Sequence, residues 1–249
     1  MIDNQMYQEY PYPIGNQFIF MLEFWQGLLA NIQWQLSGAD ALGLLLLTLW
    51  LWLIYPSRDL AELAANRQLQ GRALLALSAM MGIWLFNASI HGLLQLHFLG
   101  LVTLMLMFSW RLATILALLP SAFYCVFVLK APGHFGAYAL MGVCLPLFVA
   151  FVIHNRSFYL LPKNLFVLIF VSGFANAGLS QLSHESFWSL WLGISGAYSW
   201  QVLWHDYLSL SILMMFPEAL LNGMAVTLLV VYRPEWLADY SDRHYLWRG

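Results

Sequence analysis

Charged residues are scarce in this sequence. Lys, Arg, Asp and Glu make up 9% of the 249 residues, whereas hydrophobic residues make up 61% and tryptophan alone occurs 12 times. Soluble domains carry about 25% charged residues, so this composition excludes a soluble globular protein. Roughly 20 helical residues cross a bilayer core of about 30 Å, and several stretches near that length lack Lys and Arg. The composition therefore predicts an all-α, polytopic membrane helical bundle.

Basic residues are also missing from the first part of the chain. The first is Arg58, and Asp3 and Glu9 precede it, so no cleavable secretory signal is expected. Phosphate-loop signatures are lacking as well, so any ATP hydrolysis must come from a partner. We expect the lipid bilayer to surround the chain and no nucleic acid to bind it.

Cysteine is nearly absent. Cys125 and Cys144 both fall in apolar runs, where a thiol packs as a small hydrophobe; a disulfide or a metal site is the alternative. The segment "HES" (184–186) lacks the second histidine of the HExxH motif, which excludes that kind of zinc site.

Seven apolar stretches are predicted to span the membrane. Their ranges are 36–55, 73–90, 93–110, 112–129, 135–153, 164–182 and 207–232. When the loops alternate between the two sides, nine Lys and Arg gather on one side and Lys130 lies opposite, which accounts for all ten. Positive residues mark the cytoplasmic side. We therefore expect a multi-pass protein of the bacterial inner membrane, with its N-terminus outside and its C-terminus in the cytoplasm.

The same pattern divides the chain into three parts. Residues 1–35 form an outer N-terminal extension, residues 36–240 a single transmembrane domain, and residues 241–249 a cytoplasmic tail. Within 18–36, apolar residues at helical spacing lie beside a polar stripe, which predicts an amphipathic helix on the outer leaflet. A re-entrant or spanning eighth segment is the alternative. Residues 183–206, rich in Trp, Ser and Gly, are predicted to form an ordered outer loop.

One carboxylate lies inside the last predicted span. Glu218, in "MMFPEALLNGM" (214–224), is 11 residues into that helix, about 16 Å deep. Facing lipid there would cost an ionised carboxylate at least about 2.5 kcal/mol, so Glu218 must face the interior, be paired or be protonated. Asn222 lies one turn away on the same face and completes an interior polar pair. The pair is either a structural staple for a helix end or amide, or part of a ligand pathway.

Two histidines flank a tight turn in "NASIHGLLQLHFLG" (87–100). The span that begins near Leu93 is short, so a small hairpin is expected to hold His97 below the outer surface. Neutral imidazole is the commonest side-chain ligand for nickel, cobalt, zinc and copper. His91 and His97 are six residues apart and share no helix face, so a common metal site requires the turn between them. The alternative is that His97 is an interfacial histidine held by hydrogen bonds.

The remaining histidines show no metal-ligand spacing. Those in predicted outer loops are expected to be solvated, and the others are predicted to be cytoplasmic. They are His134, His184 and His205 in the first group, and His154 and His244 in the second.

Three stretches together resemble the CbiM/NikM family, the substrate-binding membrane components of energy-coupling-factor (ECF) importers for nickel and cobalt. They are "IHGLLQLHFLG" (90–100), "FSWRLATILALL" (108–119) and "FPEALLNGMAVTLLVVYRPEWL" (216–237). The resemblance implies that His97 matches the family's metal-ligating histidine and that a divalent metal ion is the substrate, with no permanently bound cofactor. It also implies two partners: an ECF scaffold transmembrane protein and ATPase subunits.

This sequence departs from the family at its start. Family members begin Met-His-Ile-Pro, and the terminal amine, a backbone amide and that histidine bind the metal with the loop histidine. This chain begins Met-Ile-Asp-Asn-Gln. We therefore expect a compensating metal set of His91, His97 and Glu218, with a softer specificity than a square-planar nickel site has.

The expected function is a substrate-binding permease component of an ECF importer for a divalent transition metal ion such as cobalt or nickel, with no enzymatic activity. The alternative is a non-transporting membrane sensor or assembly module that kept the fold without the metal clamp. An intramembrane protease is a third hypothesis, because "GISGA" (193–197) matches the Gly-x-Ser-Gly of rhomboid-type enzymes. That chemistry needs a base that holds the serine in a dry pocket, whereas Ser195 falls in a predicted polar loop.

Overall fold

Residue 26 and residues 32–238 are described by the structure, a computed structural model. Three helices come first: α2 (Gly38–Ile54), α3 (Ser57–Ala65) and α4 (Arg67–Trp84). Ser37 caps α2, since its hydroxyl accepts from the Asp40 N–H at 3.1 Å and the Asp40 carboxylate accepts from the Ser37 N–H at 2.9 Å. Residues 32–36 are not helical, so the amphipathic helix predicted over 18–36 does not reach Leu36. The rest of that prediction, like the tail at 241–249, lies outside the described residues.

A two-stranded hairpin follows α4. Strands β1 (Asn87–His91) and β2 (Leu94–His97) pair antiparallel, and the short helix α5 (Leu101–Phe108) comes next. The hairpin predicted around His97 is confirmed, but a continuous spanning helix over 93–110 is wrong, because α5 has 8 residues and measures about 12 Å. Gly92 and Gly100 have φ angles of +50° and +67°, a conformation that glycine adopts most readily and that interrupts a helix at both positions.

The middle of the chain forms two long helical stretches. Their segments include wide π-type turns, which continue the helix with a looser pitch. The first stretch is α6 (Trp110–Phe123) with η1 (Tyr124–Val128); the second is η2 (Pro132–His134), α7 (Phe135–Ala137), η3 (Tyr138–Cys144) and α8 (Leu145–Leu160). Both match predicted spans in position, and the second extends seven residues beyond residue 153.

The last part forms a pair of long helices joined by a turn near Gly196. They are η4 (Val167–Ala175) with α9 (Asn176–Ile194), and α10 (Trp200–Val202) with η5 (Leu203–Leu208) and α11 (Ser209–Tyr232); η6 (Pro234–Trp236) ends the described chain. The outer loop predicted at 183–206 is wrong, because α9 continues through its first half. Its polar residues turn inward: Gln181, His184 and Glu185 are buried.

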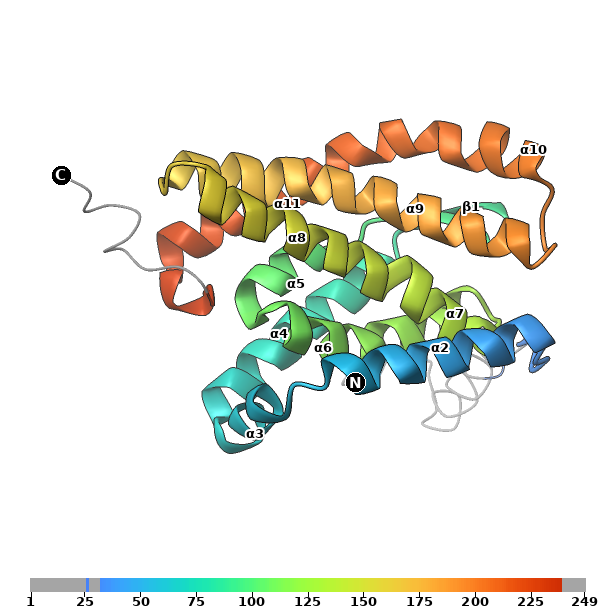
Figure 1. Ribbon diagram of the computed structural model, residues 1–249, viewed down its shortest axis with the longest axis horizontal. Helices are drawn as coiled ribbons and strands as arrows, with labels where there is room; N and C mark the ends of the chain where they lie inside the picture. The colour runs from blue at the N-terminus through green and yellow to red at the C-terminus, as the bar shows by residue number, and fades with distance from the viewer. Residues whose placement is uncertain (1–25, 27–31, 239–249) are drawn as a thin grey trace, which may run out of the picture.

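The long helices lie side by side along one direction, with α9 and α11 on one side of the bundle and α2 on the other (Figure 1). The backbones of α2 and α7 approach closely, since a Cβ built on Gly136 would lie 2.5 Å from the Leu44 backbone. Within the described residues, three helical stretches are long and apolar enough to cross a membrane, or four if α2 and α3, bent by 80°, form one span. The all-α membrane bundle is therefore confirmed, whereas a count of seven spans is not.

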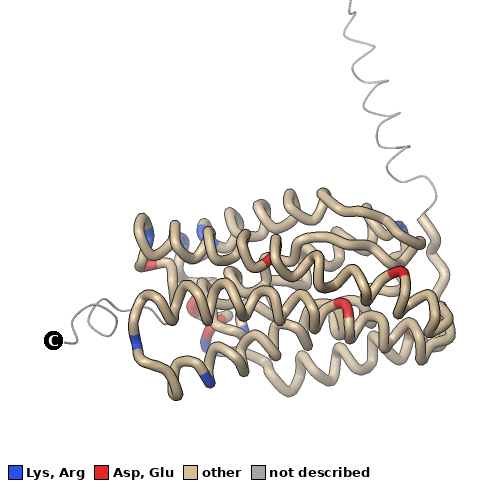
Figure 2. The backbone as a smooth tube through the Cα atoms, turned by 90° about the horizontal axis from the view of Figure 1, so that it is seen from above, with Lys and Arg blue, Asp and Glu red and all other residues tan. Residues whose placement is uncertain are grey.

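Lys and Arg residues gather toward one end of the bundle, and Asp and Glu residues are spread along it (Figure 2). The sequence predicted that Lys and Arg lie mostly on one side, and the folded molecule shows this uneven placement. Strand β2 and the acidic Glu218 lie in the interior, away from the surface that the exposed apolar side chains cover, whereas strand β1 is exposed.

Candidate functional site

His97 lies at the centre of the interior. Its side chain is carried inward by β2 and is 1% exposed. The Nδ1 atom is 2.9 Å from the Phe98 carbonyl oxygen, and Nε2 is 2.7 Å from Tyr138 Oη. Because a carbonyl can only accept, these hydrogen bonds assign the ring proton to Nδ1, and Nε2 accepts from the Tyr138 hydroxyl. The neutral ring is thereby fixed in both position and tautomer.

Aromatic rings enclose His97. The ring centroids of Tyr124, Trp84 and His184 lie 4.4 Å, 5.0 Å and 5.4 Å from its own. All of these side chains are at most 1% exposed, so the imidazole is in a dry, weakly polar pocket. Trp84 also donates its indole N–H to the Leu99 carbonyl at 2.9 Å, which fixes the end of the hairpin.

Glu218 and Asn222 hold the other side of the hairpin. The Glu218 carboxylate accepts from the N–H groups of Leu99 at 2.9 Å and Gly100 at 2.8 Å, and from Asn222 Nδ2 at 2.8 Å. Asn222 Oδ1 in turn accepts from the N–H and the hydroxyl of Thr103, at 3.0 and 2.8 Å. The backbone N–H groups of Leu99, Gly100 and Thr103 lie at the start of α5, where helical N–H groups lack partners within the helix and the helix dipole is positive. The arrangement is that of the staple, the first of the two sequence interpretations.

Side chains from three other elements bind the hairpin backbone and Gln95. Tyr124 Oη donates to Gln95 Oε1 at 3.1 Å, and Tyr207 Oη donates to the Gln95 carbonyl at 3.3 Å. The indole of Trp188 donates to the Leu93 carbonyl at 3.1 Å. Irregular backbone at membrane depth survives only where the protein itself supplies such partners. The β2 side of the hairpin is therefore held within the interior by contacts with three other elements.

His184 also belongs to the buried side chains around His97, although the sequence predicted that it is solvated in an outer loop. It lies on α9, is 1% exposed, and its Nδ1 hydrogen-bonds with the Gly142 carbonyl of η3. The prediction of a solvated loop histidine is wrong because α9 continues as a helix past residue 182. The spacing of Gln181, His184, Glu185 and Trp188 on one helical face was the signal that would have revealed it.

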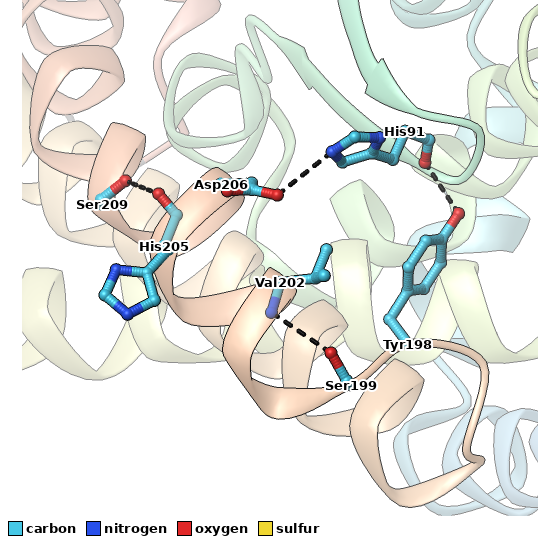
Figure 3. Close-up of polar contacts among 7 residues, drawn as sticks. All are labelled: His91, Tyr198, Ser199, Val202, His205, Asp206 and Ser209. Atoms are coloured by element: carbon cyan, nitrogen blue, oxygen red, sulfur yellow. Dashed lines mark hydrogen bonds and ion pairs between the residues drawn. The ribbon is translucent and has the colours of Figure 1, made fainter.

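His91 does not join His97. It lies on the exposed strand β1, where its Nε2 is 3.1 Å from Asp206 Oδ2 and its carbonyl accepts from Tyr198 Oη at 2.7 Å (Figure 3). The His91 and Asp206 side chains are 51% and 43% exposed. Over the described residues there is no group of three or more His, Cys, Asp or Glu that could hold a metal ion. The predicted set of His91, His97 and Glu218 is thus not assembled, since β1 faces outward and Glu218 is engaged by the α5 N-terminus.

A family model described as the cobalt uptake substrate-specific transmembrane region, CbiM, matches residues 31–236. The chain belongs to the CbiM family. No curated protein matches this sequence. A crystal structure of a truncated transition metal transporter matches this CbiM-family chain with a TM-score of 0.60 and 15% identity, and covers 79% of this chain and 96% of that one. At this identity the match concerns the fold alone.

The family places this chain among the transmembrane components of transition metal uptake, so the resemblance and the membrane prediction are confirmed.

In this CbiM-family chain, other candidate residues have structural partners. His134 forms an ion pair with Asp40 and is thus not merely solvated, whereas His205 is exposed, as predicted. Ser195 donates its hydroxyl to the Leu192 carbonyl at 3.2 Å at the end of α9. Both cysteines are buried and free, which confirms that they are packed as hydrophobes.

Proposed function

We propose that this chain is the substrate-binding permease component of an ECF importer and accepts a divalent transition metal ion, cobalt or nickel, from outside the cell. The observation that carries this proposal is His97. Its imidazole is buried in the middle of a CbiM-family fold, and its Nδ1 proton is tied to a carbonyl. A neutral imidazole prepared in this way is a good ligand for a borderline transition metal.

The other predicted site residues take different roles in this proposal. Glu218 and Asn222 position the hairpin, because their polar atoms are engaged by the backbone around Leu99 and Thr103. His91 forms an exposed pair with Asp206, outside the buried group. The chain itself acts on no substrate chemically; its role is to bind and release the ion.

Release of the ion inward requires energy from other subunits. The sequence has no phosphate-binding loop, so we propose a scaffold transmembrane protein and an ATPase pair as partners. The end of the bundle rich in Lys and Arg faces the cytoplasm in this proposal, which places the N-terminus outside in the bacterial inner membrane.

Uptake of radioactive cobalt or nickel into cells that express the chain with its transport partners tests the function. His97→Ala removes the buried ligand and is expected to reduce accumulation to the level of cells without the chain. His205→Ala is the matched control, because His205 is exposed and Figure 3 draws no hydrogen bond or ion pair to its ring from the other residues shown. Unchanged accumulation in the His97→Ala cells would contradict the proposal. If metal also fails to raise the melting temperature of the purified protein while a stable partner copurifies, the sensor or assembly module replaces it.

A further inference from the structure

We propose that His184 is the second imidazole ligand, so that the metal ion is held between the Nε2 atoms of His97 and His184. The inference rests on the proposed function and adds a residue to its site. The two histidines come from separate elements, β2 and α9, and are both 1% exposed. The approach of the two rings is therefore a result of the fold.

The two histidines are prepared in the same way. His97 Nδ1 hydrogen-bonds with the Phe98 carbonyl, and His184 Nδ1 with the Gly142 carbonyl. A carbonyl only accepts, so the neutral form of each ring carries its proton on Nδ1 and a lone pair on Nε2. Metal-ligating histidines almost always donate their other ring N–H to a carbonyl, a carboxylate or water, which fixes tautomer and ring orientation. Both rings meet this condition before any metal is bound.

The separation of the rings suits one ion. A metal bonded to Nε2 at about 2.1 Å lies about 3.2 Å from the ring centroid, so two rings at a tetrahedral angle have centroids about 5.2 Å apart. The centroids of His97 and His184 are 5.4 Å apart, with the ring planes inclined by 76°. The spacing of the two ring centroids therefore matches that of two imidazoles bonded to one metal.

Tyr138 marks the direction of the His97 lone pair. Its hydroxyl is 2.7 Å from His97 Nε2, and its ring centroid is 6.0 Å from that of His184. An arriving ion replaces this hydrogen bond at Nε2. The Tyr138 hydroxyl keeps its proton and turns it away from Nε2, so the phenol oxygen is within reach as a neutral ligand. Two imidazoles without a carboxylate favour cobalt, nickel, zinc or copper over magnesium or calcium, which prefer oxygen ligands.

Titration of the purified full chain with Co²⁺ alone tests this site, by calorimetry and by the visible absorption of the bound ion. His97→Ala and His184→Ala are each expected to weaken Co²⁺ binding by at least about 10-fold, since losing even an outer partner of a ligand costs that much. The loss in the double variant is expected to be smaller than the product of the two single losses, because both side chains serve one ion. His205→Ala is the control and keeps wild-type affinity.

A His184→Ala protein that binds Co²⁺ as tightly as wild type overturns the inference. If His97→Ala still abolishes uptake in that case, the proposed function stands without His184; if neither variant affects uptake, the proposed function fails as well. A second measurement needs no substitution: pulsed electron paramagnetic resonance with Cu²⁺ as the bound ion counts the coordinated imidazoles. Two imidazoles support the inference, and a single one overturns it.

Discussion

At the scale of single residues, two buried glutamates have opposite surroundings. Glu218 accepts hydrogen bonds from Leu99, Gly100 and Asn222, so all its partners are donors. Glu185 on α9 is 0% exposed and accepts from Gln181 Nε2 at 2.9 Å, and its Oε2 has no hydrogen-bond partner within the part of the chain that the structure describes. Gln181 Oε1 likewise has no hydrogen-bond partner in that part of the chain, and the Ser211 side chain lies beside the Glu185 carboxylate. A carboxylate is thus well matched to its surroundings at 218 and poorly matched at 185.

The same substitution should therefore act oppositely at the two positions. Glu218→Gln replaces an acceptor oxygen by an NH₂ group that faces donors, and leaves a buried N–H unpaired, at an expected loss of about 1–3 kcal/mol. Glu185→Gln supplies two donors beside Gln181 Oε1 and Ser211 Oγ, so stability is expected to stay level or rise by about 1 kcal/mol. Thermal unfolding of the purified protein measures both, with the exposed Glu62→Gln as a control. Equal destabilisation by the two buried variants would contradict this account.

The sequence could predict that Glu218 faces the interior, because the energy of a carboxylate in lipid requires it. It could not predict the partners, since two of them are backbone groups of a hairpin whose position depends on the whole fold. His184 was missed for a related reason. Its polar neighbours in the sequence favour a loop, although on α9 they line a buried face.

At the scale of whole elements, apolar length predicted the helices best where charged residues are nearly absent from the predicted span. The stretches that contain α6, α8 and α11 are of this kind, and each was located from its apolar run. The segment 93–110 was misjudged because an apolar run is equally consistent with a buried strand and a buried helix. Gly92 and Gly100, both at positive φ, decide between the two, but glycine also occurs inside ordinary spanning helices.

Two glycines test how closely neighbouring helices pack. Gly136 on α7 lies against α2, and a Cβ there would be 2.5 Å from Leu44, whereas a Cβ built on Gly71 of α4 has nothing within 4 Å among the described residues. Gly136→Ala is therefore expected to destabilise the protein by about 1–3 kcal/mol through overpacking. Gly71→Ala is expected to stabilise it by up to about 1 kcal/mol, since alanine is the better helix former. Melting temperatures of the two variants check this, and a Gly136→Ala protein as stable as wild type would show that α2 and α7 separate without cost.

At the scale of the whole molecule, the uneven placement of basic residues predicts which end of the bundle faces the cytoplasm. Lys and Arg gather toward one end of the bundle (Figure 2), and the cytoplasmic side of a membrane protein is the positive one. An importer must present its metal site to the outside first, so the direction of insertion and the proposed function depend on each other. In the proposed orientation, the turn between α9 and α10 lies outside and the junction of α3 and α4 lies in the cytoplasm.

Cysteine labelling of intact cells with a membrane-impermeant maleimide measures that direction. Cys125 and Cys144 are both 0% exposed, so the wild-type chain is expected to remain unlabelled and serves as background. Ala197→Cys, exposed in the turn after α9, is expected to react in intact cells. Ala65→Cys, exposed at the end of α3, is expected to react only after the cells are permeabilised. Labelling of Ala65→Cys alone in intact cells would mean that the basic end faces outward, and an ion from outside would then meet the arginine-rich surface before it reached His97.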